Sequence, residues 1–289
     1  MKNNTCNPKI NTTSFSCYTL EQLKNIAKTL NKRGKNIKIV NNKRILWNNI
    51  NDIMKNECSK EWCWANSSYL SNTNNDLNEM FRPIHPDDWL ENNLTWLSNF
   101  DIDNVLEQYE KVDNDFIFLG PVPIDFEDIY TELTKKNLND LYNKGKKKIG
   151  IVFNLDPHYM GGSHWVAMFI NIVNKKKGII AYYDSYGIEP NQRIQDLMSK
   201  FIAQGLGSNN KENLILLEPL YNPIRHQHKN SECGMYSINF IISMLKSTGT
   251  RNDFFKICKN IISDDNMNKL RQFYFLNNGK KNNRLNKID

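Results

Sequence analysis

The sequence changes character abruptly at residue 233, and this change is its most constraining feature. A polar, charged turn runs from His226 to Glu232, and a strongly apolar stretch of helical character begins at Cys233. A cysteine in the first turn of a helix feels the positive end of the helix dipole, which favours thiolate over thiol. Gly234 would leave room for a substrate backbone, while the first N–H groups of the helix and the Gln227 side chain could hold an oxyanion. We therefore predict that Cys233 is a nucleophile.

A cysteine nucleophile needs a base, and the base needs an orienting group. His164 begins a β-rich run, residues 174–178 form a turn, and a second β-rich run ends at Asp184. In an antiparallel hairpin the start of one strand lies beside the end of the next. We expect His164 and Asp184 to meet at one edge of a sheet, where Asp184 orients the imidazole towards Cys233.

Four blocks of sequence carry a family resemblance: residues 97–103, 162–169, 225–234 and 262–267. The order His, Asp, Gln, Cys and the Gln-x5-Cys-Gly spacing resemble the ubiquitin-like-protein protease family, the SUMO-protease type of cysteine peptidase. Papain-like enzymes place the cysteine first. Within that family the chain is most similar to polyprotein-processing proteases of large DNA viruses, of the African swine fever virus type. The similarity spans roughly residues 94–275.

The resemblance implies a fold and a set of site residues. The fold is α+β, a SUMO-protease-like cysteine peptidase domain in which helices flank a mixed sheet and the nucleophile lies at a helix N-terminus. The implied catalytic residues are His164, Asp184, Cys233 and Gln227. The implied substrate-binding residues are Trp165, Trp96, Asn99 and Gly234. The two tryptophans would flatten the channel so that only glycines pass beneath their rings, although core packing is an equal alternative for Trp96.

The resemblance also implies a function. We expect a cysteine endopeptidase that cleaves viral structural polyprotein or capsid precursors at Gly-Gly-Xaa-like sites during virion maturation. Such a protease needs no cofactor and no metal, and it would act in the viral factory of the host cytoplasm and in the virion.

The length of 289 residues predicts one sizeable core and one small appendage. We expect a basic, mostly helical N-terminal arm domain over residues 1–80 and the catalytic domain over residues 81–289, with the boundary signalled by the polar stretch that follows residues 56–64. There is no long apolar run and no signal-peptide pattern, so we expect neither a membrane association nor secretion. We expect a monomer.

The positive charge of the chain is concentrated in its first sixty residues. Residues 1–60 carry twelve Lys and Arg against three acidic residues, whereas the remainder is slightly acidic. Two helices, over residues 19–30 and 44–54, flank a basic loop and a short extended stretch, an arrangement that resembles a small nucleic-acid-binding module of the SAP kind. The candidate DNA-binding residues are Lys32, Arg33, Lys35, Lys43 and Arg44. A docking arm solvated by its charges is the favoured alternative, because charge alone is weak evidence for a ligand.

The cysteines are scattered along the chain without a disulfide or zinc framework, at positions 6, 17, 58, 63, 233 and 258. Cys58 and Cys63, with His85 further on, do not match the spacing of a zinc site, and packing beside tryptophans is favoured. The pattern fits a reducing cytosol.

Other elements are expected from hydrophobic periodicity. We predict strands over residues 116–119, 148–153 and 214–217, and helices over residues 126–141, 191–204, 252–262 and 264–275. Another helix, capped by Ser98 or Asn99, would bury Ile102, Val105, Leu106 and Tyr109. Glu232 precedes the nucleophile and would oppose its thiolate if it pointed inward, so we expect Glu232 to face solvent.

Two other functions remain open. The first is a deSUMOylating or deubiquitinating isopeptidase, which would use the same chemistry on host conjugates. The second is a DNA-associated virion protein in which the protease fold is only a scaffold. The presence of His164, Asp184 and Cys233 together argues against the scaffold.

Overall fold

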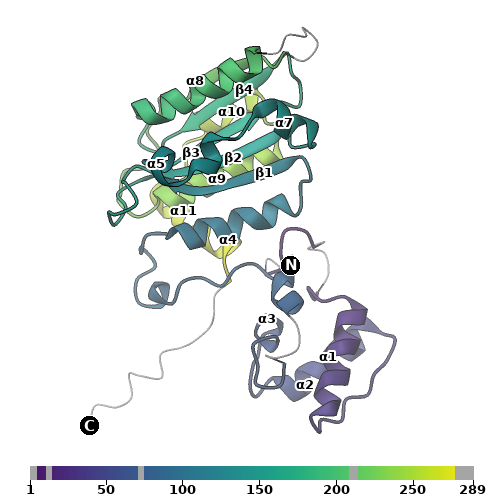
Figure 1. The fold of residues 1–289 in the computed structure, drawn as a ribbon. Helices are drawn as coiled ribbons and strands as arrows, with labels where there is room; N and C mark the ends of the chain where they lie inside the picture. The colour runs from purple at the N-terminus through teal and green to yellow at the C-terminus, as the bar shows by residue number, and fades with distance from the viewer. Residues whose placement is uncertain (1–4, 11–14, 71–74, 208–213, 277–289) are drawn as a thin grey trace, which may run out of the picture. The chain divides into compact units, whose positions relative to one another are not determined.

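A computed structural model describes residues 5–10, 15–70, 75–207 and 214–276, and Figure 1 shows its ribbon. The chain forms two compact units. The N-terminal unit contains the described residues up to 84 together with residues 273–276, and the second unit contains residues 85–272. The expected division at residue 80 had assigned residues 273–276 to the catalytic part of the chain.

Helices and strands alternate irregularly along the chain. The N-terminal unit contains α1 (Leu20–Lys32), α2 (Lys43–Met54), α3 (Glu61–Trp64) and the 3-10 helix η1 (Asn75–Met80). The second unit contains η2 (Asp87–Leu90), α4 (Asn99–Glu110), β1 (Phe116–Pro123), α5 (Phe126–Ile129), α6 (Thr131–Thr134), α7 (Leu138–Asn143), β2 (Lys148–Asn154), β3 (Trp165–Asn171), β4 (Gly178–Tyr183), α8 (Gln192–Leu206), β5 (Leu217–Tyr221), α9 (Cys233–Lys246), α10 (Arg251–Lys259) and α11 (Asp264–Lys269). The last helix is α12 (Arg271–Tyr274).

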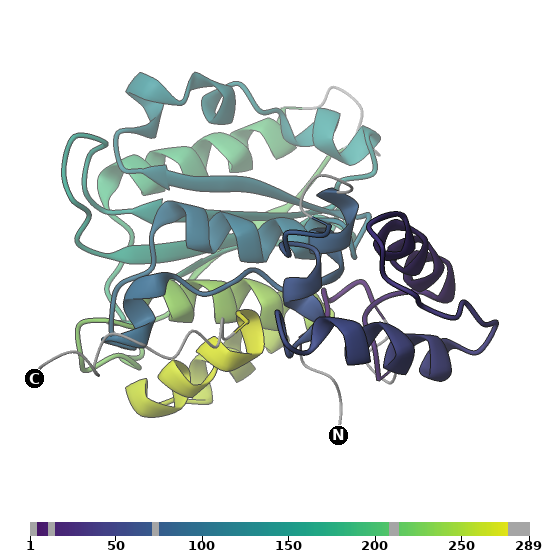
Figure 2. The same cartoon turned by 90° about the horizontal axis from the view of Figure 1, so that it is seen from below.

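The second unit is built on a five-stranded mixed sheet with the order β1-β2-β3-β4-β5. The two outer pairs, β1 with β2 and β4 with β5, are parallel, whereas β2, β3 and β4 are antiparallel. Figure 2 shows helices on both sides of this sheet, with α8 on one side and α4 and α9 on the other. The expected α+β architecture, a mixed sheet flanked by helices, is therefore confirmed.

The central strand β3 is buried along its whole length because helices cover both faces of the sheet. Val166, Met168 and Ile170 alternate towards the core shared with α8. On the opposite face, Gly150 of β2 lies against Phe116 and Ile241, and an added Cβ would come within 2.9 Å of the Phe116 ring. The missing side chain at residue 150 therefore lets α9 approach the sheet closely.

Several predicted elements differ from the structure. The helix expected over residues 126–141 is divided into α5, α6 and α7, because the Asn137 side chain accepts N–H bonds from Asn139 and Asp140 and starts a new helix. The strand expected over residues 214–217 begins at Leu217 instead. Because β5 is an edge strand, it tolerates Pro219, which has no N–H to donate.

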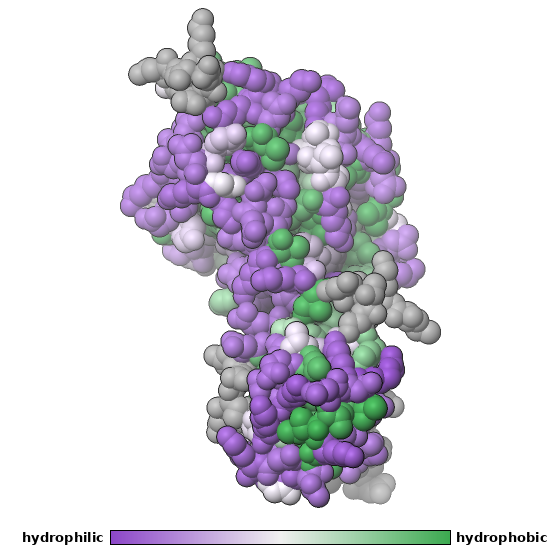
Figure 3. All heavy atoms as spheres, turned by 90° about the vertical axis from the view of Figure 1, so that its right-hand side faces the viewer, coloured by the Kyte–Doolittle hydropathy of each residue, from purple (hydrophilic) through white to green (hydrophobic). Residues whose placement is uncertain are grey.

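The N-terminal unit has its own core. Thr19 caps α1 with a capping box, as predicted, and Leu23, Ile26 and Leu30 of the predicted apolar face are buried. Residues 37–40 belong to no helix or strand, and the short extended stretch expected there stays a prediction. Trp64 is also buried in this core, so the polar stretch after it does not separate two folded parts. Figure 3 shows, on one face, apolar atoms between the mostly hydrophilic side chains of this unit.

The cysteine interpretation needs a correction. Disulfides join Cys6 to Cys17 and Cys58 to Cys63, both in the N-terminal unit, where no disulfide framework was expected. The partners of the first pair lie on segments that only the folded core brings together, so spacing alone could not reveal it. Cys233 and Cys258 are free and buried.

Candidate active site

The hairpin of β3 and β4 brings His164 and Asp184 together, as the sequence predicted. His164 directly precedes β3 and Asp184 directly follows β4, and His164 Nε2 lies 2.7 Å from Asp184 Oδ1. The Tyr186 backbone N–H donates to the same carboxylate oxygen at 2.8 Å. Asp184 is almost completely buried, so its carboxylate is held in one orientation between the ring and the backbone.

The charge on His164 depends on two opposing influences. Burial lowers the pKa of the imidazole, but hydrogen bonds to Asp184 and Cys233 and their negative charges raise it, and the net result is a pKa of about 9. Of the influences that raise this pKa, the hydrogen bond to Asp184 is the largest. A protonated ring that is hydrogen-bonded to a buried carboxylate is suited to exchange a proton with a neighbouring nucleophile.

The ring of His164 is also held from its face. Tyr186 stacks on it with ring centroids 4.6 Å apart, and the Arg225 guanidinium lies over the Tyr186 ring. Neither residue was predicted as part of the site. Tyr186 lies two residues after Asp184, in a tight turn that follows the end of β4. In this turn the Gly187 N–H donates to the Asp184 carbonyl, and the turn places the tyrosine ring beside His164.

The sequence predicted two kinds of N–H donor for an oxyanion, the first N–H groups of the Cys233 helix and the Gln227 side chain. Cys233 is the first residue of α9, where backbone N–H groups lack helical partners. The Gln227 side chain is fully buried; its Oε1 accepts from Ser185 Oγ at 2.7 Å and its Nε2 donates to the Lys229 carbonyl at 2.7 Å. These bonds fix the amide orientation and leave Nε2 a second hydrogen.

Gly234 has a different environment from the one expected. It was predicted to leave room for a substrate backbone, but it packs against Leu97, whose Cβ would lie 3.0 Å from an added Cβ. The carbonyl of Leu97 accepts the Trp165 indole N–H at 3.0 Å. The absent side chain at residue 234 thus lets the segment that carries Leu97 lie directly against the start of α9.

A groove of about 500 Å³ adjoins these residues. Trp165, Trp96, Leu97 and Asn99 lie in its wall, so the groove contains three of the four predicted substrate-binding residues. Trp96 is 41 % exposed, which argues against core packing as its role. The rest of the lining comes from Ser98, Pro121, Val122, Pro123, Ile129, Asn154, Asp156, Pro157, His158, Met160, Gly161 and Gly162. The groove meets the catalytic residues at Trp165, which directly follows His164.

Comparison with known proteins places the chain in a family. The model of the Ulp1 protease family, C-terminal catalytic domain, matches residues 81–283. The chain belongs to the Ulp1 protease family. It is therefore a cysteine peptidase, as predicted.

The relatives of this Ulp1-family peptidase include viral proteases. A protein of Acanthamoeba polyphaga mimivirus, whose name describes it as a thiol protease, is 30% identical over 96% of this chain and 95% of its own length. A cysteine protease of African swine fever virus is 26% identical over 64% of this chain and 69% of its own. The crystal structure of an African swine fever virus protease covers 96% of this chain and 97% of its own with a TM-score of 0.66 and 21% identity, so the fold is shared.

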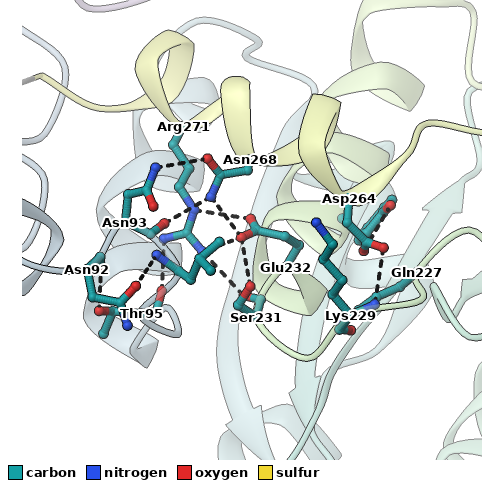
Figure 4. A network of polar contacts seen from close by, with 12 residues as sticks. Asn92, Asn93, Thr95, Gln227, Lys229, Ser231, Glu232, Asp264, Asn268 and Arg271 are labelled. Carbon is teal, nitrogen blue, oxygen red and sulfur yellow. Dashed lines mark hydrogen bonds and ion pairs between the residues drawn. The ribbon is translucent and has the colours of Figure 1, made fainter.

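Glu232 of this Ulp1-family peptidase does not face solvent, in contrast to the prediction. Its carboxylate is 1 % exposed and pairs with Arg271, which donates to it from Nε at 3.1 Å and from Nη2 at 3.0 Å (Figure 4). The charge of Glu232 is therefore neutralised locally by the Arg271 guanidinium. Sequence reasoning missed Arg271 because it lies 39 residues further along the chain.

The five basic residues predicted to bind DNA are only partly available. Lys35 lies over the Tyr69 ring, and Lys43 and Arg44 both lie over the Phe15 ring. These contacts stabilise the N-terminal unit itself. Lys32 lies in the last turn of α1, where a cation complements the helix dipole, and Arg33 follows as the C-cap.

The described residues contain no cluster of His, Cys, Asp and Glu that could bind a metal ion. Among the described helices, none has the length and apolar character needed to cross a membrane.

Proposed function

We propose that the chain is an endopeptidase in which Cys233 is the nucleophile, His164 the acid and base, and Asp184 the residue that orients His164. The observation that carries this proposal is the 2.7 Å contact of His164 Nε2 with the buried Asp184 carboxylate, together with the place of Cys233 as the first residue of α9. Gln227 Nε2 and the backbone N–H of Cys233 form the oxyanion hole.

The geometry supports a two-step acyl transfer. The Cys233 thiolate attacks the scissile carbonyl carbon, a C–S bond forms, and the carbonyl electron pair moves onto oxygen, where the oxyanion-hole N–H groups stabilise it. The intermediate collapses as the C–N bond breaks, and protonated His164 gives its proton to the leaving amine. Neutral His164 then takes a proton from water as the water attacks the thioester, and the acid and the thiolate are released.

The proposed substrates are viral structural polyprotein or capsid precursors with a Gly-Gly-Xaa-like cleavage site. Two observations support this choice: the relatives named above are viral proteases, and Trp96 and Trp165 line the groove beside His164. Aromatic walls narrow a channel and favour residues without side chains at the cut. Action in the viral factory and the virion remains part of this proposal, as does DNA binding through Lys32 and Arg33.

A second candidate substrate is a host SUMO conjugate, because some African swine fever virus relatives are named SUMO-1 cysteine protease. The same active site would then cleave an isopeptide bond after a Gly-Gly terminus. A fluorogenic SUMO-1 fusion distinguishes the two substrates, since turnover much faster than that of a short Gly-Gly peptide indicates recognition of the folded SUMO surface.

The test compares peptides that carry Gly-Gly or Ala-Ala at the cut, with the wild type, Cys233→Ala and Cys258→Ala. Cys258 is the matched control because it is the other free, buried cysteine of the described chain. We expect turnover of the Gly-Gly peptide by the wild type and Cys258→Ala, and none by Cys233→Ala. Hydrolysis that persists without Cys233 would exclude the proposed nucleophile, and equal rates on both peptides would exclude the narrow channel.

A further inference from the structure

α11 and Arg271, the first residue of α12, direct three side chains at the turn that precedes Cys233. Asp264, Asn268 and Arg271 follow the i, i+4, i+7 spacing of a helical face, and Figure 4 shows all three pointing towards residues 227–232. Arg271 and Asn268 bind Glu232 at the end of this turn. Asp264 binds His228 and Lys229 in the middle of the turn.

Asp264 binds the turn through the backbone N–H groups of the turn. A single carboxylate oxygen, Oδ2, accepts the N–H groups of His228 at 2.9 Å and of Lys229 at 3.1 Å. Asp264 is only 6 % exposed, so water competes weakly for these bonds. Hydrogen bonds from two successive backbone N–H groups to a buried carboxylate fix the local direction of the chain.

The peptide that Asp264 holds is connected to the proposed oxyanion donor. The Lys229 N–H donates to Asp264, and the Lys229 carbonyl accepts from Gln227 Nε2 at 2.7 Å. This carbonyl, together with the Ser185 hydroxyl that donates to Gln227 Oε1, fixes the orientation of the Gln227 amide. If the turn shifted, Nε2 would move with it, and its second hydrogen would no longer point where the oxyanion forms.

The neighbouring acid provides a natural contrast. Asp265 is mostly exposed and also bonds Lys229, but through the flexible side-chain Nζ instead of the backbone. It has the same charge and lies on the same helix, yet it cannot fix the direction of the turn. Charge near the turn and control of its backbone are therefore separable in this protein.

We propose that Asp264 is a positioning residue of the oxyanion hole, acting through the Lys229 backbone on Gln227. This inference rests on the proposed function, because it assumes that Gln227 donates to the oxyanion. Asp264 does not touch the substrate. Asp264 therefore affects the transition state, in which negative charge develops on the carbonyl oxygen. Its effect on the binding of the substrate in the ground state is small.

The decisive experiment is a double-mutant cycle on peptide hydrolysis with wild type, Asp264→Asn, Gln227→Ala and the double variant. We expect Asp264→Asn to lower kcat by about tenfold with little change in KM, less than the roughly 10²–10³-fold loss caused by removing an oxyanion donor. In the Gln227→Ala background the same change should have almost no effect on kcat, because the side chain through which Asp264 acts is absent. Asp265→Asn is the matched control and should retain wild-type kcat.

Equal losses in both backgrounds would overturn the proposal, since Asp264 would then act independently of Gln227. Equal behaviour of Asp264→Asn and Asp265→Asn would also overturn it. Circular dichroism and the thermal midpoint of each variant show whether the fold is retained. Asp264→Glu, which keeps the carboxylate, should recover part of the lost kcat if its longer side chain still reaches the two N–H groups.

A second readout needs no turnover and therefore separates this inference from the proposed substrate. A Gly-Gly peptide aldehyde reacts with Cys233 so that a C–S bond forms, the His164 proton moves to the former carbonyl oxygen, and that oxygen lies in the oxyanion hole. Iodoacetamide alkylates the same sulfur with loss of iodide and makes no oxyanion. Asp264→Asn should weaken the binding of the aldehyde by about tenfold and leave the rate of alkylation by iodoacetamide unchanged. Equal losses in both would mean that Asp264 acts on the sulfur.

Discussion

His164 is protonated at neutral pH because two negative neighbours outweigh its burial. The buried Asp184 carboxylate binds one ring nitrogen, Cys233 adds a further favourable influence, and the pKa rises to about 9. A group with a raised pKa carries its charge below that value and loses it as the pH rises through it. The imidazolium therefore persists over the neutral range, and the protonated ring is ready to give its proton to a leaving amine.

We predict an alkaline decline of kcat/KM centred near pH 9, where His164 loses its proton. Asp184→Asn removes the main group that raises the pKa, so the midpoint should move down towards the ordinary histidine value of about 6.5. The measurement is kcat/KM against pH for both proteins. The control is Asp125→Asn, which removes the carboxylate partner of another histidine, His158, and should leave the midpoint in place. A midpoint unmoved in Asp184→Asn would contradict this account of the charge on His164.

At the scale of elements, the α11–α12 segment connects two parts of the active site. Arg271 donates to the buried Glu232 carboxylate beside the nucleophile and, from Nη1 at 2.8 Å, to the carbonyl of Thr95. Thr95 precedes Trp96 and Leu97 of the groove wall. A single guanidinium, whose planar fork can serve several acceptors, thus ties the turn before Cys233 to the segment that forms the groove.

Removing one partner of the Glu232–Arg271 ion pair should lower the stability of the protein. Arg271→Met leaves the Glu232 charge buried without its cation, and we expect a loss of about 3–5 kcal/mol in the free energy of unfolding. Glu232→Gln combined with Arg271→Met removes both charges and should recover most of that loss. Urea unfolding of the three proteins measures this, with Asp265→Asn as a surface-pair control whose midpoint should not move. A double variant as unstable as the single one would show that the pair acts through packing and not through charge.

The sequence identified the elements that follow short-range rules. The apolar helix after Cys233, the His164–Asp184 hairpin and the Thr19 cap depend on periodicity and capping, which neighbouring residues determine. The beginning of β5 at Leu217 depends on its register with β4, and pairing between distant segments is not visible in periodicity.

The same limit applies to the site. The exposure expected of Glu232 was inferred from its neighbours in sequence and was wrong because its partner, Arg271, is remote, and the packing of Gly234 against the equally remote Leu97 was not predicted. A charged residue beside a nucleophile is normally expected to be solvated, and only the fold supplies the buried cation that permits another arrangement. Tyr186 was missed for a related reason, because its stacking on His164 depends on the turn after β4.

At the scale of the whole molecule, the chain contributes to the N-terminal unit twice. After residues 5–84, it returns with residues 273–276. Leu276 is buried in the core of that unit, forms a parallel bridge with Ile84, and donates its N–H to the Pro83 carbonyl at 2.8 Å. The core of the N-terminal unit therefore depends on a side chain from the far end of the sequence.

We predict that Leu276→Ala destabilises the N-terminal unit by about 2–5 kcal/mol, the usual cost of truncating a buried leucine. Hydrogen exchange should accelerate in α1 and α2, while the amides of β3 remain protected. Phe273→Ala is the control, because Phe273 is in the same segment but 39 % exposed. Exchange that accelerates equally in β3 would show that the two units unfold together.

The return of residues 273–276 fixes the order in which the molecule can be completed during synthesis. The first 84 residues leave the ribosome while Leu276 does not yet exist, and at about 5–20 residues per second roughly 190 further residues take on the order of 10–40 s. For that interval the N-terminal unit lacks one of its buried side chains. The N-terminal unit is therefore completed only after the catalytic unit, which follows it in the chain, has been synthesised.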